Sequence, residues 1–371
     1  MDVFVPAIPT MSLYFKTNGS VIQASLYVFM LTVALGQLFI GSMADRFGRR
    51  RITLYAGFLF FAGSLLAALS QSISTLIIAR MIQAAGACGT YLLCFIIIRD
   101  NFLTTTCARL FSILCGTNAM IASSAPVIGG ILLDLTQDWR SGFYFLTILC
   151  LIMSFIAFRN IPDYEYPKQE LSYLSVFKMI LFNNDFRQYT LIASVSLLGL
   201  YLFCALSPGI LIDQLHLSPT QYGLWFGLNA MTVFFINILT ARLTYLYALE
   251  KITRFGLFWI IFSCILMIFL NFYQISVVRF MLSMLCLTIG IGLSMGTATA
   301  LALKDFKQQA GTATALLGAC QFGLSGFIGI LTAQWTPKPL SLALPVLCLS
   351  TLGLVKIRRL TDYKHTYPQK M

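Results

Sequence analysis

The sequence predicts an all-α polytopic membrane protein from its charge content, its hydropathy and the length of its apolar runs. Charged residues make up 10% of 371 positions, whereas an ordinary soluble domain carries about 25%. Hydrophobic residues make up 58% and the mean hydropathy is +0.83, so the apolar side chains are too many for one buried core. The runs lack the alternation of strands, and backbone groups in lipid are satisfied only in helices or closed barrels. We therefore expect membrane-spanning helices.

Eleven apolar runs are long enough to cross a bilayer. They cover residues 20–43, 52–70, 74–98, 108–134, 141–158, 187–212, 221–247, 253–273, 276–303, 310–335 and 339–357. A shorter run from Val3 to Tyr14 precedes them and covers only about 18 Å of a hydrocarbon core of about 30 Å. We therefore expect twelve spans, with a truncated first helix whose beginning is missing from this sequence.

The distribution of basic residues predicts the orientation of these spans. If the first span begins in the cytoplasm, 20 of the 25 Lys and Arg residues fall in cytoplasmic segments, as the positive-inside rule requires. Topology therefore accounts for the formal net charge of +12, and no nucleic-acid partner is expected. The expected partners are the lipid bilayer, protons and a small-molecule substrate.

The longest polar interval divides the predicted spans into six plus six. We expect an N-terminal six-helix half over residues 1–158, a cytoplasmic linker over 159–186, a C-terminal six-helix half over 187–357 and a cytoplasmic tail over 358–371. Two such halves are typical of transporters that bind substrate between them near the bilayer midplane.

Cofactor chemistry and metal binding are not expected. The ten cysteines form no C-x-x-C pair, and only two histidines are present, so no ligand set for zinc or haem is recognisable. No phosphate-binding loop of the G-x-x-x-x-G-K-[ST] type occurs, which argues against an ATP-driven pump in a single chain. We expect no cofactor, no metal and no enzymatic activity.

The connector after the second span carries the first recognisable motif, which reads Gly41-Ser-Met-Ala-Asp45-Arg46-Phe-Gly48-Arg49-Arg50-Arg51. It resembles the major facilitator signature G-x-x-x-D-R-x-G-R-R. The resemblance implies a major facilitator fold and a cytoplasmic gate formed by Gly41, Asp45, Arg46, Gly48, Arg49 and Arg50, with Asp100 as a further member. It also implies that Asp45 meets the start of the eleventh helix near Ala310. The alternative, a basic loop that serves only topology, leaves Gly41, Asp45 and Gly48 unexplained.

A polar stripe runs along the fourth span. Arg80, Gln83, Ala84, Ala87 and Tyr91 fall at helical spacings, so one face carries the polar groups and is expected to line the cavity. As an alternative, Arg80 is only about 9 Å inside its helix and could extend its side chain to the outer interface.

The fifth span contains Ala125-Pro126-Val-Ile-Gly129-Gly130, which resembles the antiporter motif G-P-x-x-G-G with Ala in place of the first Gly. The resemblance implies that Pro126, Gly129 and Gly130 form an antiporter helix. Proline bends a helix and paired glycines allow a neighbour to approach closely. Ordinary small-residue packing is the alternative interpretation.

The chain opens with Asp2-Val3-Phe4-Val5-Pro6-Ala7-Ile8-Pro9. This string resembles D-x-Y-L-P-A-L-P of the bicyclomycin and chloramphenicol resistance (Bcr/CflA) group of drug/proton antiporters, with Phe4 in place of Tyr. Asp2 lies about 21 Å before Lys16, hence deep in the bilayer if the helix continues upstream. Burial in hydrocarbon favours the protonated carboxyl, which can then exchange its proton against substrate. If the chain begins at Met1, Asp2 is instead a solvated end residue.

Further strings follow the same group through the rest of the chain. They are Asp138-Trp139-Arg140, Leu206-Ser207-Pro208, Ser218-Pro219-Thr-Gln-Tyr222-Gly223, Gly290-Ile-Gly292 and Ala310-Gly311-Thr312-Ala313. The resemblance implies proton-coupled efflux of small, mostly apolar drugs by a monomer in the bacterial cytoplasmic (inner) membrane. Asp2 would carry the proton, and Arg80 with Gln83 would sense its charge.

Polar and aromatic residues of the pore-facing helices are candidates for the substrate cavity. These are Tyr27, Tyr91, Asn118, Tyr201, Trp225 and Asn229. An aromatic-rich pocket with few fixed hydrogen bonds suits broad specificity. Three alternatives remain open: a dedicated exporter of one metabolite or siderophore, an uptake transporter for a sugar or organic acid, and a truncated paralogue that does not transport.

Overall fold

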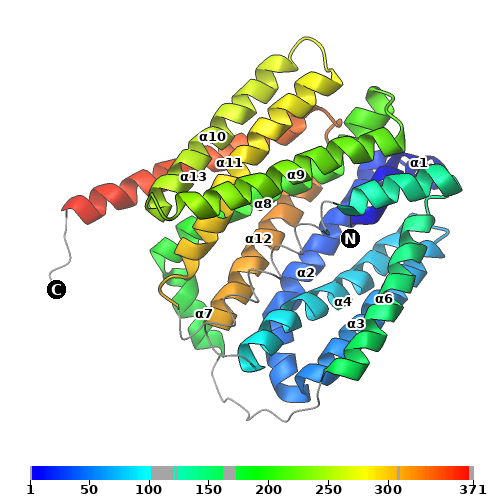
Figure 1. Ribbon diagram of the computed structural model, residues 1–371, viewed down its shortest axis with the longest axis horizontal. Coiled ribbons are helices and arrows are strands. Elements are labelled where there is room, and N and C mark those ends of the chain that lie inside the picture. Colours follow the sequence, from blue (N-terminus) through cyan, green and yellow to red (C-terminus); the bar gives the residue numbers. More distant parts are fainter. Residues whose placement is uncertain (1, 102–120, 122–123, 162–172, 307–309, 367–371) are drawn as a thin grey trace.

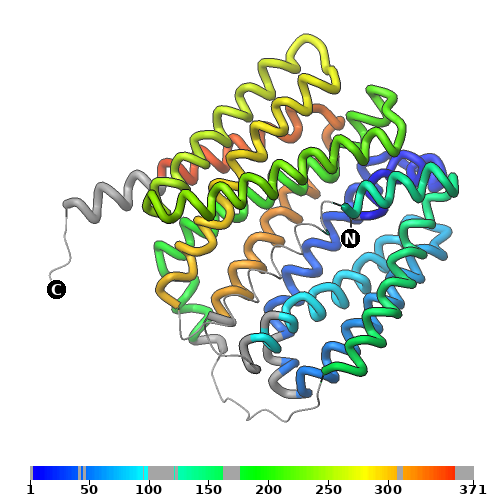
Figure 2. The backbone as a smooth tube through the Cα atoms, in the orientation of Figure 1, coloured from blue at the N-terminus to red at the C-terminus, as the bar shows by residue number. Residues whose placement is uncertain are grey.

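The computed structural model describes residues 2–101, 121, 124–161, 173–306 and 310–366 (Figures 1 and 2). Within these residues the regular structure is helical throughout. The N-terminal group comprises η1 (Asp2–Ala7), α1 (Ile8–Tyr14), α2 (Gly19–Phe47), α3 (Arg49–Ala68), α4 (Ile73–Asn101), the helix Ser124–Thr136 and α6 (Ser141–Asn160). The C-terminal group comprises α7 (Tyr173–Phe182), α8 (Asn184–Pro208), η2 (Gly209–Gln214), α9 (Pro219–Leu243), α10 (Leu249–Leu270), α11 (Val277–Leu303), α12 (Ala310–Ala333) and α13 (Pro339–Thr366).

Length and composition make most of these helices able to cross a membrane. Among the described residues, nine helices are long and apolar enough, and three shorter apolar helices cover Val3–Tyr14, Ser124–Thr136 and Pro339–Val355. Each of the twelve predicted segments overlaps one of these nine long or three shorter helices. The first segment is short in the structure as in the sequence, and it begins within the six-residue 3-10 helix Asp2–Ala7, which contains Pro6.

The helices pack in two groups that meet along their centre. In the N-terminal group, α3 lies between α4 and α6, and α2 packs on α4; in the C-terminal group, α8 contacts α11, α12 and α13, while α10 lies between α11 and α13. Helices α2 and α12 join the groups and lie side by side in the middle of Figure 1.

A continuous apolar core closes the end of the bundle that the distribution of basic residues places outside. It contains Phe4 and Ile8 of the N-terminal group together with Leu206, Ile210 and Tyr222 of the C-terminal group, each almost wholly buried. The core is therefore shared by both groups at this end.

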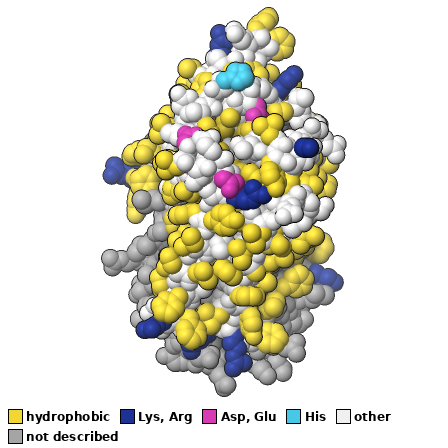
Figure 3. Space-filling view, turned by 90° about the vertical axis from the view of Figure 1, so that its right-hand side faces the viewer, with side chains coloured by type: hydrophobic (Ala, Val, Ile, Leu, Met, Phe, Trp, Pro, Cys, Tyr) yellow, Lys and Arg dark blue, Asp and Glu magenta, His cyan; other side chains and the backbone are white. Residues whose placement is uncertain are grey.

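The outward faces of the helices are apolar. On α6 the exposed side chains include Phe155, Ile156 and Phe158. Hydrophobic side chains predominate in the lower half of the described face in Figure 3, whereas the acidic side chains lie in its upper half. Such a surface is expected of a protein whose surroundings are lipid.

Two boundaries differ from the sequence prediction. Helix α7 lies inside the interval 159–186 predicted as a linker, because Val176, Phe177 and Ile180 pack on the C-terminal group. Helix α13 extends past residue 357 to Thr366, since a helix can continue after its apolar stretch has ended. By contrast, helix α8 continues beyond Pro208 as the π-helix η2, so the two together cover the span predicted at 187–212.

Candidate functional site

Arg80 is the most deeply buried cation in the described part of the chain. It lies on α4 with 0% of its side chain exposed. Its guanidinium carbon is 4.5 Å from the ring centroid of Phe4 and 4.5 Å from that of Phe29. The two rings belong to η1 and α2, so the cation joins three elements. A cation held between aromatic faces away from water gains about 2 kcal/mol or more from such a contact.

A polar relay extends from Arg80 into α3. Arg80 Nη1 donates to Gln83 Oε1, Gln83 Nε2 donates to Ser64 Oγ at 2.7 Å, and Ser64 Oγ donates to the carbonyl of Phe60 at 2.7 Å. Both Gln83 and Ser64 are fully buried. Arg80 is therefore turned into the bundle rather than toward the outer interface, which was the alternative left by the sequence.

The segment that begins with Asp2 contributes directly to this cluster. Val3, Phe4 and Val5 are each at most 4% exposed, and Phe4 stacks on Phe143 of α6 with centroids 5.3 Å apart. The side chain of Asp2 itself lies outside the described residues. The phenylalanine that replaces the family's tyrosine thus provides one of the two aromatic faces around Arg80.

The predicted antiporter helix, Ser124–Thr136, makes close backbone contacts on two sides. A Cβ added to Gly129 would collide with the carbonyl oxygen of Val3, and a Cβ added to Gly130 would lie 2.6 Å from the carbonyl oxygen of Pro219. Pro126 is buried in the same helix. The paired glycines therefore seat η1 on one side and the start of α9 on the other.

A hydrogen-bonded link between the two groups lies just beyond these glycines. Asp134 Oδ2 accepts from the backbone N–H of Thr220 at 3.1 Å and from the hydroxyl of the same residue. Thr220 is in the first turn of α9, where unpaired N–H groups and the helix dipole favour an anion. The sequence pattern did not single out Asp134; the only signal was an acid at the end of an apolar run.

The connector between α2 and α3, which the sequence predicts to be cytoplasmic, is partly described. Gly48 joins α2 to α3 with φ of +88°, a conformation that favours glycine. Arg49 is 7% exposed, and Arg50 Nη2 donates to the carbonyl of Phe158 at 3.0 Å, at the end of α6. Arg50 thus anchors α3 to α6 inside one group. The side chains of four predicted gate residues lie outside the described ones: Gly41, Asp45, Arg46 and Asp100.

The contact between α2 and α12 contains buried polar groups that the sequence pattern did not single out. Gln37 of α2 packs on Gly318, and Gln321 and Ser325 lie one and two turns further along α12. All three polar side chains are at least nine-tenths buried, and Gln37 Oε1, Gln321 Nε2 and Ser325 Oγ have no hydrogen-bond partner among the described residues. We call these three residues the polar seam.

The residues predicted to line the cavity do not form one cluster. Tyr27 is fully buried against Gly329 of α12, and Asn229 accepts a 2.7 Å hydrogen bond from Thr288 in the contact of α9 with α11. Both lie in helix contacts rather than at an open wall. The remaining candidates are Tyr91, which is 42% exposed, Tyr201, whose ring is 6.1 Å from that of Phe322, Trp225, which is half-buried, and Asn118, which lies outside the described residues.

Comparison with known families shows which family this chain belongs to. The family model of the Major Facilitator Superfamily matches residues 1–330. The chain belongs to this superfamily. As a superfamily member it is a multi-pass membrane transporter and not an enzyme, so the fold and the protein class predicted from the sequence are confirmed.

Curated relatives of this superfamily member include resistance proteins. The chain is 26% identical over 357 residues to a chloramphenicol resistance protein of Pseudomonas aeruginosa, with 96% of this chain and 85% of the relative covered. It is 29% identical over 345 residues to multidrug resistance protein D of Escherichia coli (strain K12), with 90% and 84% covered. These similarities agree with the resemblance to the Bcr/CflA group.

Solved structures support the fold. The D-xylose-proton symporter aligns with a TM-score of 0.78 over 96% of this chain and 92% of the symporter, at 14% sequence identity. An identity this low shows that the major facilitator fold is shared and says nothing of the substrate. Among the described residues no group of three or more His, Cys, Asp or Glu side chains is arranged to hold a metal ion.

Proposed function

We propose that this transporter exports small, mostly apolar molecules in exchange for protons by alternating access. The observation that carries the proposal is the wholly buried Arg80, enclosed by the segment that begins with Asp2 and tied to Gln83. A buried charge inside a membrane protein is costly and marks a functional site by default. Relatives named for chloramphenicol and multidrug resistance support the choice of substrate class.

In this proposal Asp2 binds the coupling proton, and Arg80 responds to the charge of its carboxylate through η1. The antiporter helix supports exchange because Gly129 and Gly130 seat both neighbours in backbone contact, which leaves no room for water between them. The residues 1–158 and 187–357 act as the two moving halves, joined by 159–186 and followed by the tail 358–371. We place the protein in the bacterial inner membrane because its curated relatives are bacterial transporters, and as a monomer because that is the expectation for its superfamily. The basic segments orient it with its connectors in the cytoplasm.

The cytoplasmic gate is proposed to close through Asp45 with Arg46, Arg49 and Asp100. Gly48 supplies the required backbone turn, and Arg50 holds the start of α3 to α6. The cavity is proposed to contain the polar seam together with Tyr201, whose ring lies 6.1 Å from that of Phe322 on α12. The seam offers donors and acceptors that are unpaired among the described residues and lie between the two groups.

The test uses inside-out membrane vesicles, in which export becomes uptake into an acidified lumen. Wild-type protein is expected to accumulate labelled chloramphenicol or a dye, and a protonophore is expected to abolish the accumulation. Asp2→Asn should abolish gradient-driven accumulation, whereas Asp163→Asn, in the predicted linker, should retain it. Full coupled transport by Asp2→Asn would overturn the role of Asp2. If no compound in a broad antibiotic and dye panel responds to the gradient, a dedicated metabolite exporter becomes the better assignment.

A further inference from the structure

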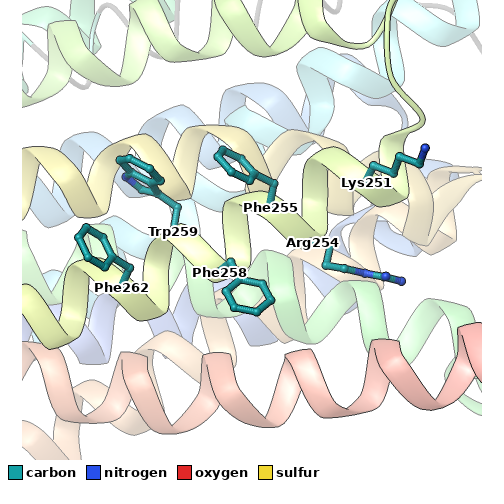
Figure 4. A pocket seen from close by; sticks show the side chains of 6 residues that line it. All are labelled: Lys251, Arg254, Phe255, Phe258, Trp259 and Phe262. Carbon is teal, nitrogen blue, oxygen red and sulfur yellow. The ribbon is translucent and has the colours of Figure 1, made fainter.

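The exposed face of α10 carries a groove that the transport mechanism does not use. The groove has a volume of about 500 Å³ and is lined by six side chains of this one helix: Lys251, Arg254, Phe255, Phe258, Trp259 and Phe262 (Figure 4). We call it the α10 groove. It lies on the outside of the bundle, because α10 packs mainly on α11 and α13 and the groove-lining Phe255, Phe258 and Phe262 are exposed.

The lining of the α10 groove changes in character along the helix. Both cations lie in its first two turns, and the four aromatic side chains follow toward the middle of the helix. From Lys251 to Phe262 the helix rises about 16 Å, which is comparable to the thickness of one leaflet's hydrocarbon. The basic end is the cytoplasmic end according to the distribution of Lys and Arg.

The four aromatic side chains, which we call the aromatic wall, are Phe255, Phe258, Trp259 and Phe262. Contacts within the protein hold Trp259 in place. Trp259 Nε1 donates to the carbonyl of Cys286 on α11 at 2.9 Å. Its ring lies 5.9 Å from that of Phe255 and 5.8 Å from that of Phe262. With its polar atom satisfied by α11, Trp259 presents an apolar face to the groove. A wall of this kind can pack against a hydrocarbon chain, but it provides no hydrogen-bonding group for a polar ligand.

The charges around the mouth favour an anion there. Glu250 precedes the cations, so the first two turns of α10 carry two positive charges and one negative charge. A second acid, Asp185 of α8, lies nearby and pairs with Lys304 Nζ at 3.3 Å, so three cations and two acids are found in this region. Lys251 is exposed, and its ammonium group is directed outward from the helix (Figure 4). The mouth is therefore positive at the level of lipid phosphates.

We propose that the α10 groove binds an anionic phospholipid of the cytoplasmic leaflet, with its phosphate at Lys251 and Arg254 and one acyl chain along the aromatic wall. A purely apolar face would accept any lipid and would need no cations, whereas basic sites at the cytoplasmic side of a membrane protein select acidic headgroups. Each basic residue near the headgroup is expected to raise the preference for an anionic over a zwitterionic lipid by roughly fivefold.

The test measures which lipid lies beside Trp259. The chain has four tryptophans, and a variant that keeps only Trp259 is reconstituted with phosphatidylglycerol or phosphatidylcholine carrying brominated acyl chains, which quench indole fluorescence on contact. Brominated phosphatidylglycerol is expected to quench at several-fold lower mole fraction than brominated phosphatidylcholine. Lys251→Gln with Arg254→Gln should make the two lipids equal. High salt should reduce the preference, because the headgroup contact is electrostatic.

Two controls separate headgroup selection from general lipid contact. A variant that keeps only Trp335, which is 46% exposed near the outer end, should be quenched equally by both lipids. Arg242→Gln, at the end of α9 and outside the groove, should leave the preference at Trp259 unchanged. Equal quenching of Trp259 by both lipids in the otherwise unchanged protein would overturn the proposal, as would a preference that survives the double substitution.

Discussion

The carboxylate of Asp134 accepts the backbone N–H of Thr220 at 3.1 Å, so a helix of the N-terminal group caps the first turn of α9 in the C-terminal group. A charged acceptor at a helix N-terminus is among the stronger hydrogen-bonding arrangements in proteins. The link lies beside Gly129 and Gly130 of the predicted antiporter helix and beside the apolar core shared by both groups. Asp134 is therefore positioned to hold the outer end closed and to be released when that end opens.

Asp134→Ala is predicted to shift the protein toward an outward-open state. Loss of a charge-assisted hydrogen bond worth about 1.5–3 kcal/mol should change the equilibrium between closed and open outer ends by tenfold or more. Spin labels at Leu135 and Leu224, both exposed on either side of the link, should report a longer distance by double electron–electron resonance.

The matched control for this substitution is Asp138→Ala. Asp138 pairs with Arg140 at 3.6 Å within the same turn and makes no described contact with the C-terminal group. Asp138→Ala should therefore leave the distance between the spin labels unchanged. An unchanged distance in Asp134→Ala would show that the core alone keeps the outer end closed.

Phe4 is predicted to be energetically coupled to Arg80. In a double-mutant cycle on thermal unfolding in detergent, Phe4→Leu and Arg80→Met should show a coupling of about 1–2 kcal/mol, because the ring face and the guanidinium are both desolvated. Phe143→Leu serves as the comparison, since Phe143 stacks on Phe4 at 5.3 Å without a described contact with Arg80. If Phe143→Leu couples to Arg80→Met as strongly as Phe4→Leu does, general packing and not the cation–ring contact accounts for the coupling energy.

Gly129→Ala is predicted to destabilise the protein by about 1–3 kcal/mol, because the new methyl group meets the carbonyl of Val3 and neither backbone can yield cheaply. Gly296→Ala on α11 is the control, since nothing lies within 4 Å of its added Cβ and alanine favours helix by up to about 1 kcal/mol. The two melting temperatures should move in opposite directions. A Gly129→Ala protein as stable as wild type would contradict the close contact with η1.

The sequence alone predicts the helices well, whereas it singles out only some of the residues that the structure brings together. Span positions follow from hydropathy and length, which lipid enforces; α7 was missed because a ten-residue surface helix has no such signal. Arg80 and Gln83 stand out in the sequence because polar groups in a span are conspicuous, and the structure joins them by a hydrogen bond; their role in coupling stays a prediction. Asp134 was missed because its partner lies 86 residues away, and only the tertiary fold brings the two together. Tyr27 was selected by its residue type, which does not distinguish a cavity wall from a helix contact.

The polar seam is predicted to be more important for transport than for stability. Gln321 lies near the middle of α12 and is 7% exposed, and its Nε2 is unpaired among the described residues. Burial of this amide group therefore destabilises the folded protein, because no hydrogen bond to Nε2 compensates for the lost hydration. Gln321→Leu should therefore raise the melting temperature or leave it unchanged. If the amide contacts substrate, as proposed, the same substitution should reduce gradient-driven accumulation at least several-fold.

Ser350→Ala is the matched control for the seam. Ser350 of α13 is fully buried with an unpaired hydroxyl among the described residues, as Ser325 is, but α13 packs on α8 and α10 away from the contact of α2 with α12. Its replacement should also be tolerated in thermal unfolding, and transport should be retained. Equal loss of transport in both variants would mean that buried polar groups in the C-terminal group support helix movement in general. Unchanged transport in Gln321→Leu would remove the seam from the substrate pathway, because removal of a specific donor to bound substrate costs affinity.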